Sequence, residues 1–226
     1  MLKYTLTMII TLLSDIHGNI DQIEKIAETL RTSDLLLLSG DITHFGKENE
    51  AKQIIRRISE YQSNILAVSG NCDYPEVEYY LSKEGISVHS KSAIFGGIGF
   101  LGVGGSLPCP GSTPNELSEK EMKEFLALAY ASLYETIPFI LVVHHPPFNT
   151  FSDHANGGIH MGSHVVSQAI ENYKPLMCVC GHIHEAKGKD KVFDSIVINP
   201  GDFKEGNYAL VKIYDYNVDT ISMLYT

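Results

Sequence analysis

Five short apolar runs in this chain each end in a small cluster of polar residues. The runs cover residues 8–13, 35–38, 65–68, 139–143 and 176–180. Continuous apolar stretches of this length are typical of β-strands that are buried on both faces. In open α/β sheets, functional groups gather at the carboxyl ends of the strands. The sequence therefore predicts buried strands that deliver their polar clusters to one rim.

Helical patterns separate these runs and indicate the fold class. An apolar stripe at helical spacing covers residues 20–30, and a second one comprises Ala51, Ile54, Ile55 and Ile58. Strands that alternate with helices favour right-handed crossovers and a largely parallel sheet. We expect an α/β fold, a layered α/β/α sandwich in which two mixed β-sheets pack face to face between flanking helices.

The second half of the chain extends this pattern. Helices are predicted over residues 116–134, with Asn115 or Ser118 as the N-cap, and over residues 162–173. Short strands are expected over 86–104, and the tail from 192 to 225 has three β-rich segments. With 226 residues, 44% of them hydrophobic, residues 1–226 are expected to form a single domain.

The five polar clusters are rich in aspartate, histidine and asparagine. They cover residues 14–19, 39–41, 69–73, 144–147 and 181–184. Asp15 and His17 stand two apart, as do His182 and His184, so each pair is expected to point the same way at a strand end. Carboxylate and imidazole suit Mn²⁺, Fe or Zn²⁺, and no thiolate-rich set indicates a closed structural zinc site. The clusters therefore predict a metal site.

The order of these clusters carries a family resemblance. In chain order they are D-x-H at 15–17, GD at 40–41, GN at 70–71, an apolar strand that ends in His144, GHxH at 181–184, and a further NPG at 199–201. This order resembles the calcineurin-like metallophosphoesterase superfamily. The resemblance covers nearly the whole chain, and five motifs in the family's order are much more specific than any one of them.

The resemblance implies a centre with two divalent metal ions, Mn, Fe, Zn or Ni. Its ligands would be Asp15, His17 and His184 around one ion, Asn71, His144 and His182 around the other, and Asp41 as the bridge. His144 is preferred over His145 because the family's histidine directly ends the strand. The implied reaction is hydrolysis of a phosphoester by a hydroxide that bridges the metals, with Asp41 and Asn71 orienting the site.

One position departs from the fuller family pattern. Many members have a histidine after GN that assists the leaving group, whereas this chain has Cys72 and reads GNCD, as in a smaller bacterial and archaeal branch of phosphodiesterases. A thiol is a poor substitute for an imidazolium donor, and Asp73 is interpreted as a structural or supporting carboxylate. The loop over 145–165 offers a replacement. We hypothesise that His160 or His154 reaches the substrate phosphate, and His160 is the catalytic candidate.

Charge and cysteine usage limit the partners. A formal net charge of −10 counts against sequence-independent nucleic-acid binding, which needs a basic face. The four cysteines form no CxxC pair and are interpreted as reduced thiols of a cytoplasmic protein. No segment approaches membrane-spanning length. The expected partner is a small phosphoester substrate, and a homo-oligomer is left open.

Four functions compete on this sequence. A metal-dependent phosphoesterase is expected, with a phosphodiesterase preferred over a phosphomonoesterase. A protein phosphatase is disfavoured because the chain reads GDITHFG where that group has GDxVDRG, and it lacks GNHE. A noncatalytic scaffold of the same fold is the main alternative, but every expected ligand position holds a competent side chain. A nuclease would need a basic groove and usually a capping domain, and neither is visible in the sequence.

Overall fold

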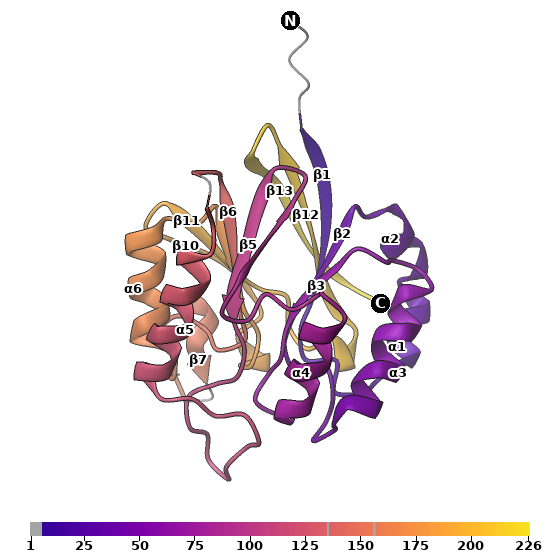
Figure 1. Ribbon diagram of the computed structural model, residues 1–226, viewed down its shortest axis with the longest axis horizontal. Helices are drawn as coiled ribbons and strands as arrows, with labels where there is room; N and C mark the ends of the chain where they lie inside the picture. The colour runs from indigo at the N-terminus through magenta and orange to yellow at the C-terminus, as the bar shows by residue number, and fades with distance from the viewer. Residues whose placement is uncertain (1–5, 135, 156) are drawn as a thin grey trace, which may run out of the picture.

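Two large β-sheets lie face to face, and helices cover both outer surfaces (Figure 1). The computed structural model describes residues 6–134, 136–155 and 157–226. The expected α/β sandwich with two mixed sheets and flanking helices is confirmed. In these ranges, no helix combines the length and the apolar character needed to cross a membrane.

The first sheet has the order β13-β12-β1-β2-β3. Its parallel strands are β1 (Thr7–Leu13), β2 (Leu35–Ser39) and β3 (Ile65–Val68). The C-terminal strands β12 (Asn207–Tyr214) and β13 (Asn217–Tyr225) form a hairpin, and β12 pairs antiparallel with β1. The three strands from the first half of the chain run parallel as expected, and the sheet is mixed because the end of the chain returns along the first strand.

The second sheet has the order β10-β11-β9-β6-β5-β4. Its strands are β4 (Ser92–Phe95), β5 (Ile98–Val103), β6 (Phe139–Val143), β9 (Met177–Val179), β10 (Gly188–Val192) and β11 (Ser195–Asn199). The strands β5, β6, β9 and β11 run parallel, and the two edge strands are antiparallel to their neighbours. A separate hairpin, β7 (His154–Ala155) and β8 (Ile159–His160), lies in the loop after β6.

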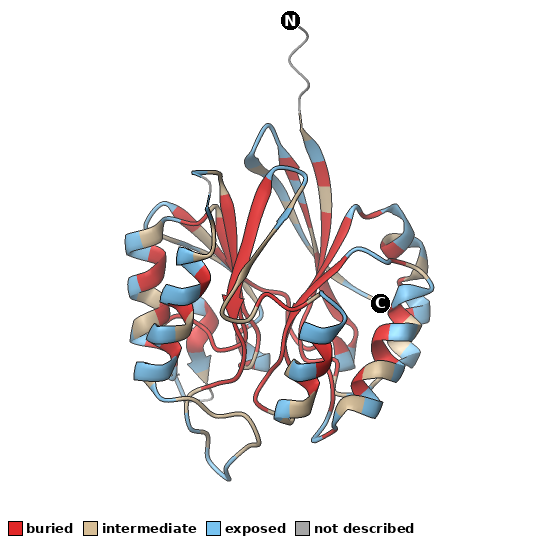
Figure 2. Cartoon of the chain, in the orientation of Figure 1, coloured by how far each residue is buried: buried red, intermediate tan, exposed pale blue. Residues whose placement is uncertain are grey.

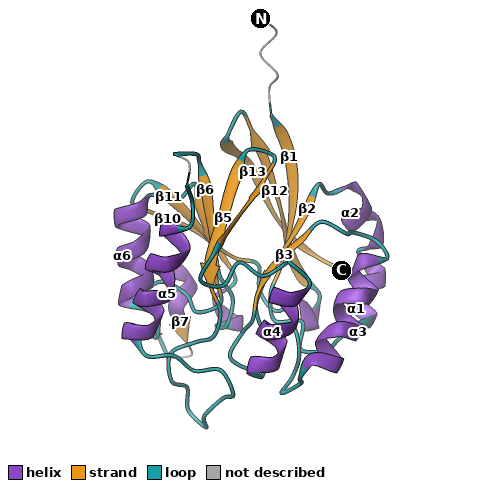
Figure 3. Cartoon of the chain, in the orientation of Figure 1, coloured by secondary structure: helices purple, strands orange, loops and turns teal. Residues whose placement is uncertain are grey.

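Helices α1 to α4 lie on the side of the first sheet, and α5 and α6 lie on the second (Figure 3). Their bounds are α1 (Asp21–Lys25), α2 (Ala27–Thr32), α3 (Glu48–Ser59), α4 (Pro75–Lys83), α5 (Glu119–Ala131) and α6 (His164–Tyr173). Three short 3₁₀ turns are η1 (Phe151–Asp153), η2 (His184–Ala186) and η3 (Phe203–Glu205). The helix predicted over 20–30 is two short helices, because Ile26 has a φ of −106° and a ψ of 16°.

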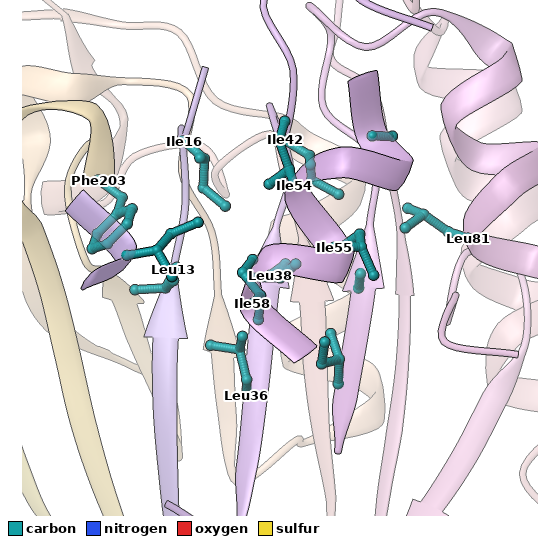
Figure 4. Packing of buried hydrophobic residues seen from close by; sticks show 14 of the residues in the cluster. Leu13, Ile16, Leu36, Leu38, Ile42, Ile54, Ile55, Ile58, Leu81 and Phe203 are labelled. Carbon is teal, nitrogen blue, oxygen red and sulfur yellow. The ribbon is translucent and has the colours of Figure 1, made fainter. Parts of the chain in front are cut away.

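The two sheets divide the core into three apolar layers. Along β2, Leu35 and Leu37 belong to the layer between the sheets, whereas Leu36 and Leu38 belong to the layer that α3 covers (Figure 4). All four are at most 1% exposed, as the apolar run predicts. Figure 2 shows that the central strands are buried, and that the helices outside them are buried only on the faces that point towards the strands. Such rigid strands hold the loops at their carboxyl ends in place.

Candidate metal centre

Loops at the carboxyl ends of five strands carry the seven predicted ligands. These are Asp15 and His17 after β1, Asp41 after β2, Asn71 after β3, His144 after β6, and His182 and His184 after β9. Backbone hydrogen bonds hold the loops together: the Asp15 N–H donates to the Gly40 carbonyl, and the Gly181 N–H donates to the His144 carbonyl, both at 3.0 Å. Both sheets therefore contribute side chains to one place.

The first group of ligands surrounds His184. Its Nε2 lies 3.2 Å from Asp15 Oδ1 and 3.4 Å from His17 Nε2. The His17 Nε2 in turn lies 3.9 Å from Asp15 Oδ1 and 3.6 Å from Asp41 Oδ2. Asp15, His17 and His184 thus present donor atoms within 4.8 Å of one another, which is a set suited to a divalent cation. The Asp41 carboxylate lies beside this set.

The second group surrounds the Asn71 side chain. Its Oδ1 lies 2.8 Å from His144 Nε2 and 2.8 Å from His182 Nδ1. The His144 Nε2 also lies 3.5 Å from Asp41 Oδ1. Asp41 therefore presents Oδ2 to the first group and Oδ1 to the second, which is the arrangement needed for a carboxylate shared between two ions.

Hydrogen bonds on the far side of the rings show that the donor set fits a cation. The His144 Nδ1 lies 2.8 Å from the Ser39 carbonyl, which can only accept, so Nδ1 carries the proton. In the neutral ring, the Nε2 lone pair then faces Asn71 Oδ1, which is also an acceptor. A cation between these atoms would turn that repulsion into coordination. Similarly, His184 Nδ1 lies 3.5 Å from Asp202 Oδ2, a support typical of metal-binding histidines.

The charges in this centre are strongly perturbed. Burial, together with the nearby carboxylates Asp15 and Asp73 and against the opposing effect of His144, raises the pKa of Asp41 to about 7. Burial also acts to raise the pKa of Asp15, but the hydrogen bond from His184 and the imidazole charges hold it well below its usual range. The same hydrogen bond raises the pKa of His184 to about 9. A divalent cation would offset the cost of burying two neighbouring carboxylates.

The backbone at the ligands is unusual. Asp15, His17, Asp41 and His182 have positive φ values of 56°, 47°, 49° and 69°. Asp15 and His17 do face the same site, but through left-handed backbone rather than strand alternation. His182 and His184 face different groups, so the expectation that this pair points the same way is wrong. A side chain at Gly70 would collide with the Asp41 carboxylate, and the absence of one lets the two loops approach.

Asp73 and Cys72 support the Asp41 loop. The buried Asp73 carboxylate accepts the N–H groups of Ile42, Thr43 and Gly70 at 3.1, 2.7 and 2.8 Å, which is a structural role. The Cys72 N–H donates to Asp41 Oδ1 at 2.7 Å. Burial and the Asp41 charge raise the pKa of the Cys72 thiol, so the thiol is a weak acid in this position.

A pocket of about 730 Å³ adjoins the second group, because His182 is part of its lining. His160 also lines this pocket, so the structure places it outside the cluster of seven ligands. Its Nδ1 lies 2.7 Å from Oδ1 of the buried Asp153. The exposed His154 packs edge-on against His160, with ring centroids 4.2 Å apart. His145 is buried, and its Nε2 donates to the Met161 carbonyl at 2.9 Å.

Sequence reasoning missed two residues around the centre. Asp202 supports His184, and the Cys109 Sγ lies 3.6 Å from His182 Nε2. His44, interpreted from the sequence as an exposed loop residue that could approach the rim, is exposed and has its Nδ1 3.4 Å from His17 Nδ1. Asp202 directly follows the NPG segment, which is a usable signal. Cys109 lies in a loop rich in proline, glycine and serine, and no spacing connects it with His182.

Comparisons with known proteins identify the family and the fold of this chain. Residues 8–186 match the family model described as calcineurin-like phosphoesterase. The chain is 36% identical over 204 residues to an uncharacterized protein of Methanocaldococcus jannaschii, covering 88% of this chain and 89% of that protein. A crystal structure from Thermus thermophilus has a TM-score of 0.74 at 21% identity, covering 97% of this chain and 99% of that one. A structure described as a novel archaeal phosphodiesterase has a TM-score of 0.51 at 16% identity, covering 96% and 100%.

Proposed function

This chain belongs to the calcineurin-like phosphoesterase family, and we propose that it hydrolyses phosphoester bonds with two divalent metal ions held by the seven ligands. The observation that carries this proposal is the position of Asp41. Its Oδ2 lies 3.6 Å from His17 Nε2 and its Oδ1 lies 3.5 Å from His144 Nε2, so one carboxylate serves both groups. The proposed ions are Mn, Fe, Zn or Ni, and the substrate is a small phosphoester.

The side chains of this centre have separate tasks. When bound, the two ions would polarise phosphoryl oxygens and make a water molecule acidic enough to attack phosphorus at neutral pH. Asp41 and Asn71 orient the centre because each contacts more than one histidine. Ser39 and Asp202 fix the rings of His144 and His184.

We propose that His160 donates a proton to the leaving oxygen. Its Nδ1–H donates to Asp153, and its ring lines the pocket beside His182. His154 is exposed and is not among the described residues that line the pocket, so it is the weaker candidate. General acids of this kind commonly contribute about 10²–10⁴-fold to the rate.

A phosphodiester is the preferred substrate in this proposal. Cys72 stands where many relatives have a histidine, as in the GNCD branch of phosphodiesterases that the sequence resembles. The similarity in fold to a structure described as an archaeal phosphodiesterase is in line with this preference.

Hydrolysis of bis-4-nitrophenyl phosphate and 4-nitrophenyl phosphate tests the proposal. Metal-depleted protein is loaded with Mn²⁺, Ni²⁺, Zn²⁺ or Mg²⁺, and bound metal is counted by mass spectrometry. We expect metal-dependent turnover with a higher kcat/KM for the diester. Asp41→Asn should lower kcat/KM for the diester at least 100-fold. Asp219→Asn, on the exposed β12–β13 hairpin, should leave this value unchanged. Two bound ions without turnover under any metal would favour the noncatalytic scaffold.

A further inference from the structure

The pocket beside His182 has a predominantly apolar wall. Its large apolar side chains come from three separate segments: Leu107, Pro108 and Pro110 before α5, Phe148 after β6, and Ile159 and Met161 in and after β8. A volume of about 730 Å³ is in the range of sites for small organic ligands. The wall is therefore large enough to receive an organic group as well as a phosphate.

Few charged side chains line this pocket. Among the described residues that line it, there is no lysine or arginine, and the one carboxylate is Glu119. Glu119 accepts the Ser163 hydroxyl at 2.6 Å and the N–H groups of His164 and Val165 at 2.9 and 3.2 Å. Its charge is thus directed to the N-terminus of α6, where negative charge is stabilised. A ligand group that carried further phosphates would meet no described lysine or arginine here.

The outer wall leaves large apolar side chains in contact with solvent. Ile159 is 60% exposed and Met161 is 38% exposed. Phe148, another lining residue, packs against the His164 ring with centroids 3.9 Å apart, which holds this aromatic side chain in place. A bound apolar group would remove the exposed surface of Ile159 and Met161 from water, and that burial favours binding.

We propose that this pocket binds an uncharged apolar part of the substrate, an alkyl or aryl group esterified to the phosphate. The inference rests on the proposed function, because His182 contributes both to the candidate metal centre and to the pocket. A phosphate held at the metals would have its ester group beside the apolar wall.

Binding of non-hydrolysable phosphonates to the Mn²⁺-loaded protein tests this inference without relying on turnover. Isothermal titration calorimetry compares methyl-, butyl-, octyl- and phenylphosphonate. We expect the Kd to fall by about three- to fourfold for each methylene that is buried. Tighter binding of the octyl compound than of the phenyl compound would identify an aliphatic group, and the reverse order would identify an aryl group.

Two matched variants localise the effect. Ile159 and Ile94 are both strand isoleucines, 60% and 54% exposed, and only Ile159 lines the pocket. Ile159→Asn should raise the Kd of octylphosphonate about tenfold and leave that of methylphosphonate within twofold, whereas Ile94→Asn should change neither. Equal affinity for methyl- and octylphosphonate, or equal weakening by both variants, would overturn the apolar pocket. Failure of every phosphonate to bind would instead reject the proposed metal-dependent function.

Discussion

The His160 ring is positioned by the Asp153 carboxylate, which is itself fixed by backbone N–H groups. The buried Asp153 accepts the N–H groups of Asn149, Thr150 and Gly162 at 3.0, 3.0 and 3.1 Å. The same carboxylate accepts Nδ1–H of His160, so Nε2 is the ring nitrogen that remains for a substrate. A fixed ring of this kind is suited to proton donation at one position.

Replacing His160 should lower the rate of hydrolysis most for esters with poor leaving groups. We expect His160→Gln to lower kcat/KM for a phenyl phosphodiester about 100-fold, and much less for the 4-nitrophenyl diester, because nitrophenolate leaves without a proton. Steady-state kinetics on both esters measures the ratio. The exposed neighbour His154 provides the control, and His154→Gln should change neither ester. An equal loss on the two esters would point to a structural role for His160.

His89 couples folding to pH. Its Nδ1 accepts the Gly104 N–H at 3.0 Å, and burial lowers its pKa from 6.5 to about 4. Between pH 6.5 and 4, His89 binds a proton in the unfolded chain but not in the folded protein. Its contribution to the free energy of unfolding is therefore fully present above pH 6.5 and is lost as the pH falls towards 4. The part of the free energy of unfolding that is lost at pH 5 because of His89 should be at most about 2 kcal/mol.

Urea unfolding of metal-free protein at pH 7 and pH 5 measures this loss. His89→Asn can accept the same hydrogen bond without titrating, so its free energy of unfolding should fall less between the two pH values. An identical pH dependence of the wild type and the variant would show that His89 is not the cause. His145, whose pKa burial also lowers to about 4, contributes equally in both proteins.

The convergence of the candidate ligands was predictable because their loops follow apolar strands, whereas their assignment as ligands rests on the family resemblance. Asp73 was interpreted as a structural or supporting carboxylate, but the contacts of Asp202 and Asp153 were not predicted. Asp202 meets His184 only because β11 and β9 are neighbours in the sheet, and Asp153 meets His160 across the small β7–β8 hairpin. Such contacts depend on tertiary packing, which spacing along the chain does not encode.

Among the elements, the helix boundaries show where local sequence decides. The helix predicted over 116–134 begins at Glu119 because Ser118 accepts the Glu121 N–H at 3.2 Å and forms a capping box with Glu121. Asn115, the other candidate cap, instead donates to the Gly70 carbonyl at 3.0 Å. The buried strands were well predicted from their apolar runs. By contrast, α4 and the edge strand β10 went unassigned, since their polar residues give a weak periodic signal.

Removal of the α5 cap should destabilise the protein. Ser118→Ala leaves the Glu121 N–H without its side-chain acceptor, and we expect a loss of about 1 kcal/mol in the free energy of unfolding. Chemical denaturation measures this loss, and Ser63→Ala, at an exposed serine between α3 and β3, serves as the control. A change of the same size in both variants would contradict a capping effect.

At the scale of the whole molecule, the candidate centre joins the two sheets. Asp15, Asp41 and Asn71 follow strands of the first sheet, whereas His144 and His182 follow strands of the second. Ions bound to both sets would cross-link these loops in addition to the hydrogen bonds between them. Metal binding should therefore stabilise the complete sandwich.

Thermal unfolding with and without Mn²⁺ measures this linkage. At a free concentration of about 100 times the Kd, binding should add about 2.7 kcal/mol, which corresponds to an increase in Tm of roughly 5–10 °C. Addition of a chelator should reverse the increase. His144→Ala removes one ligand and should show a much smaller shift, and an undiminished shift in this variant would indicate that the metal acts elsewhere.

The left-handed backbone at Asp15, His17, Asp41 and His182 has an evolutionary consequence. Each such residue carries a conformational cost that glycine would not, of the order of 1 kcal/mol. Mutation towards glycine at these positions would relieve that cost and destroy the centre. Because substitution by glycine would relieve this cost, we infer that these four side chains are retained for the proposed metal binding.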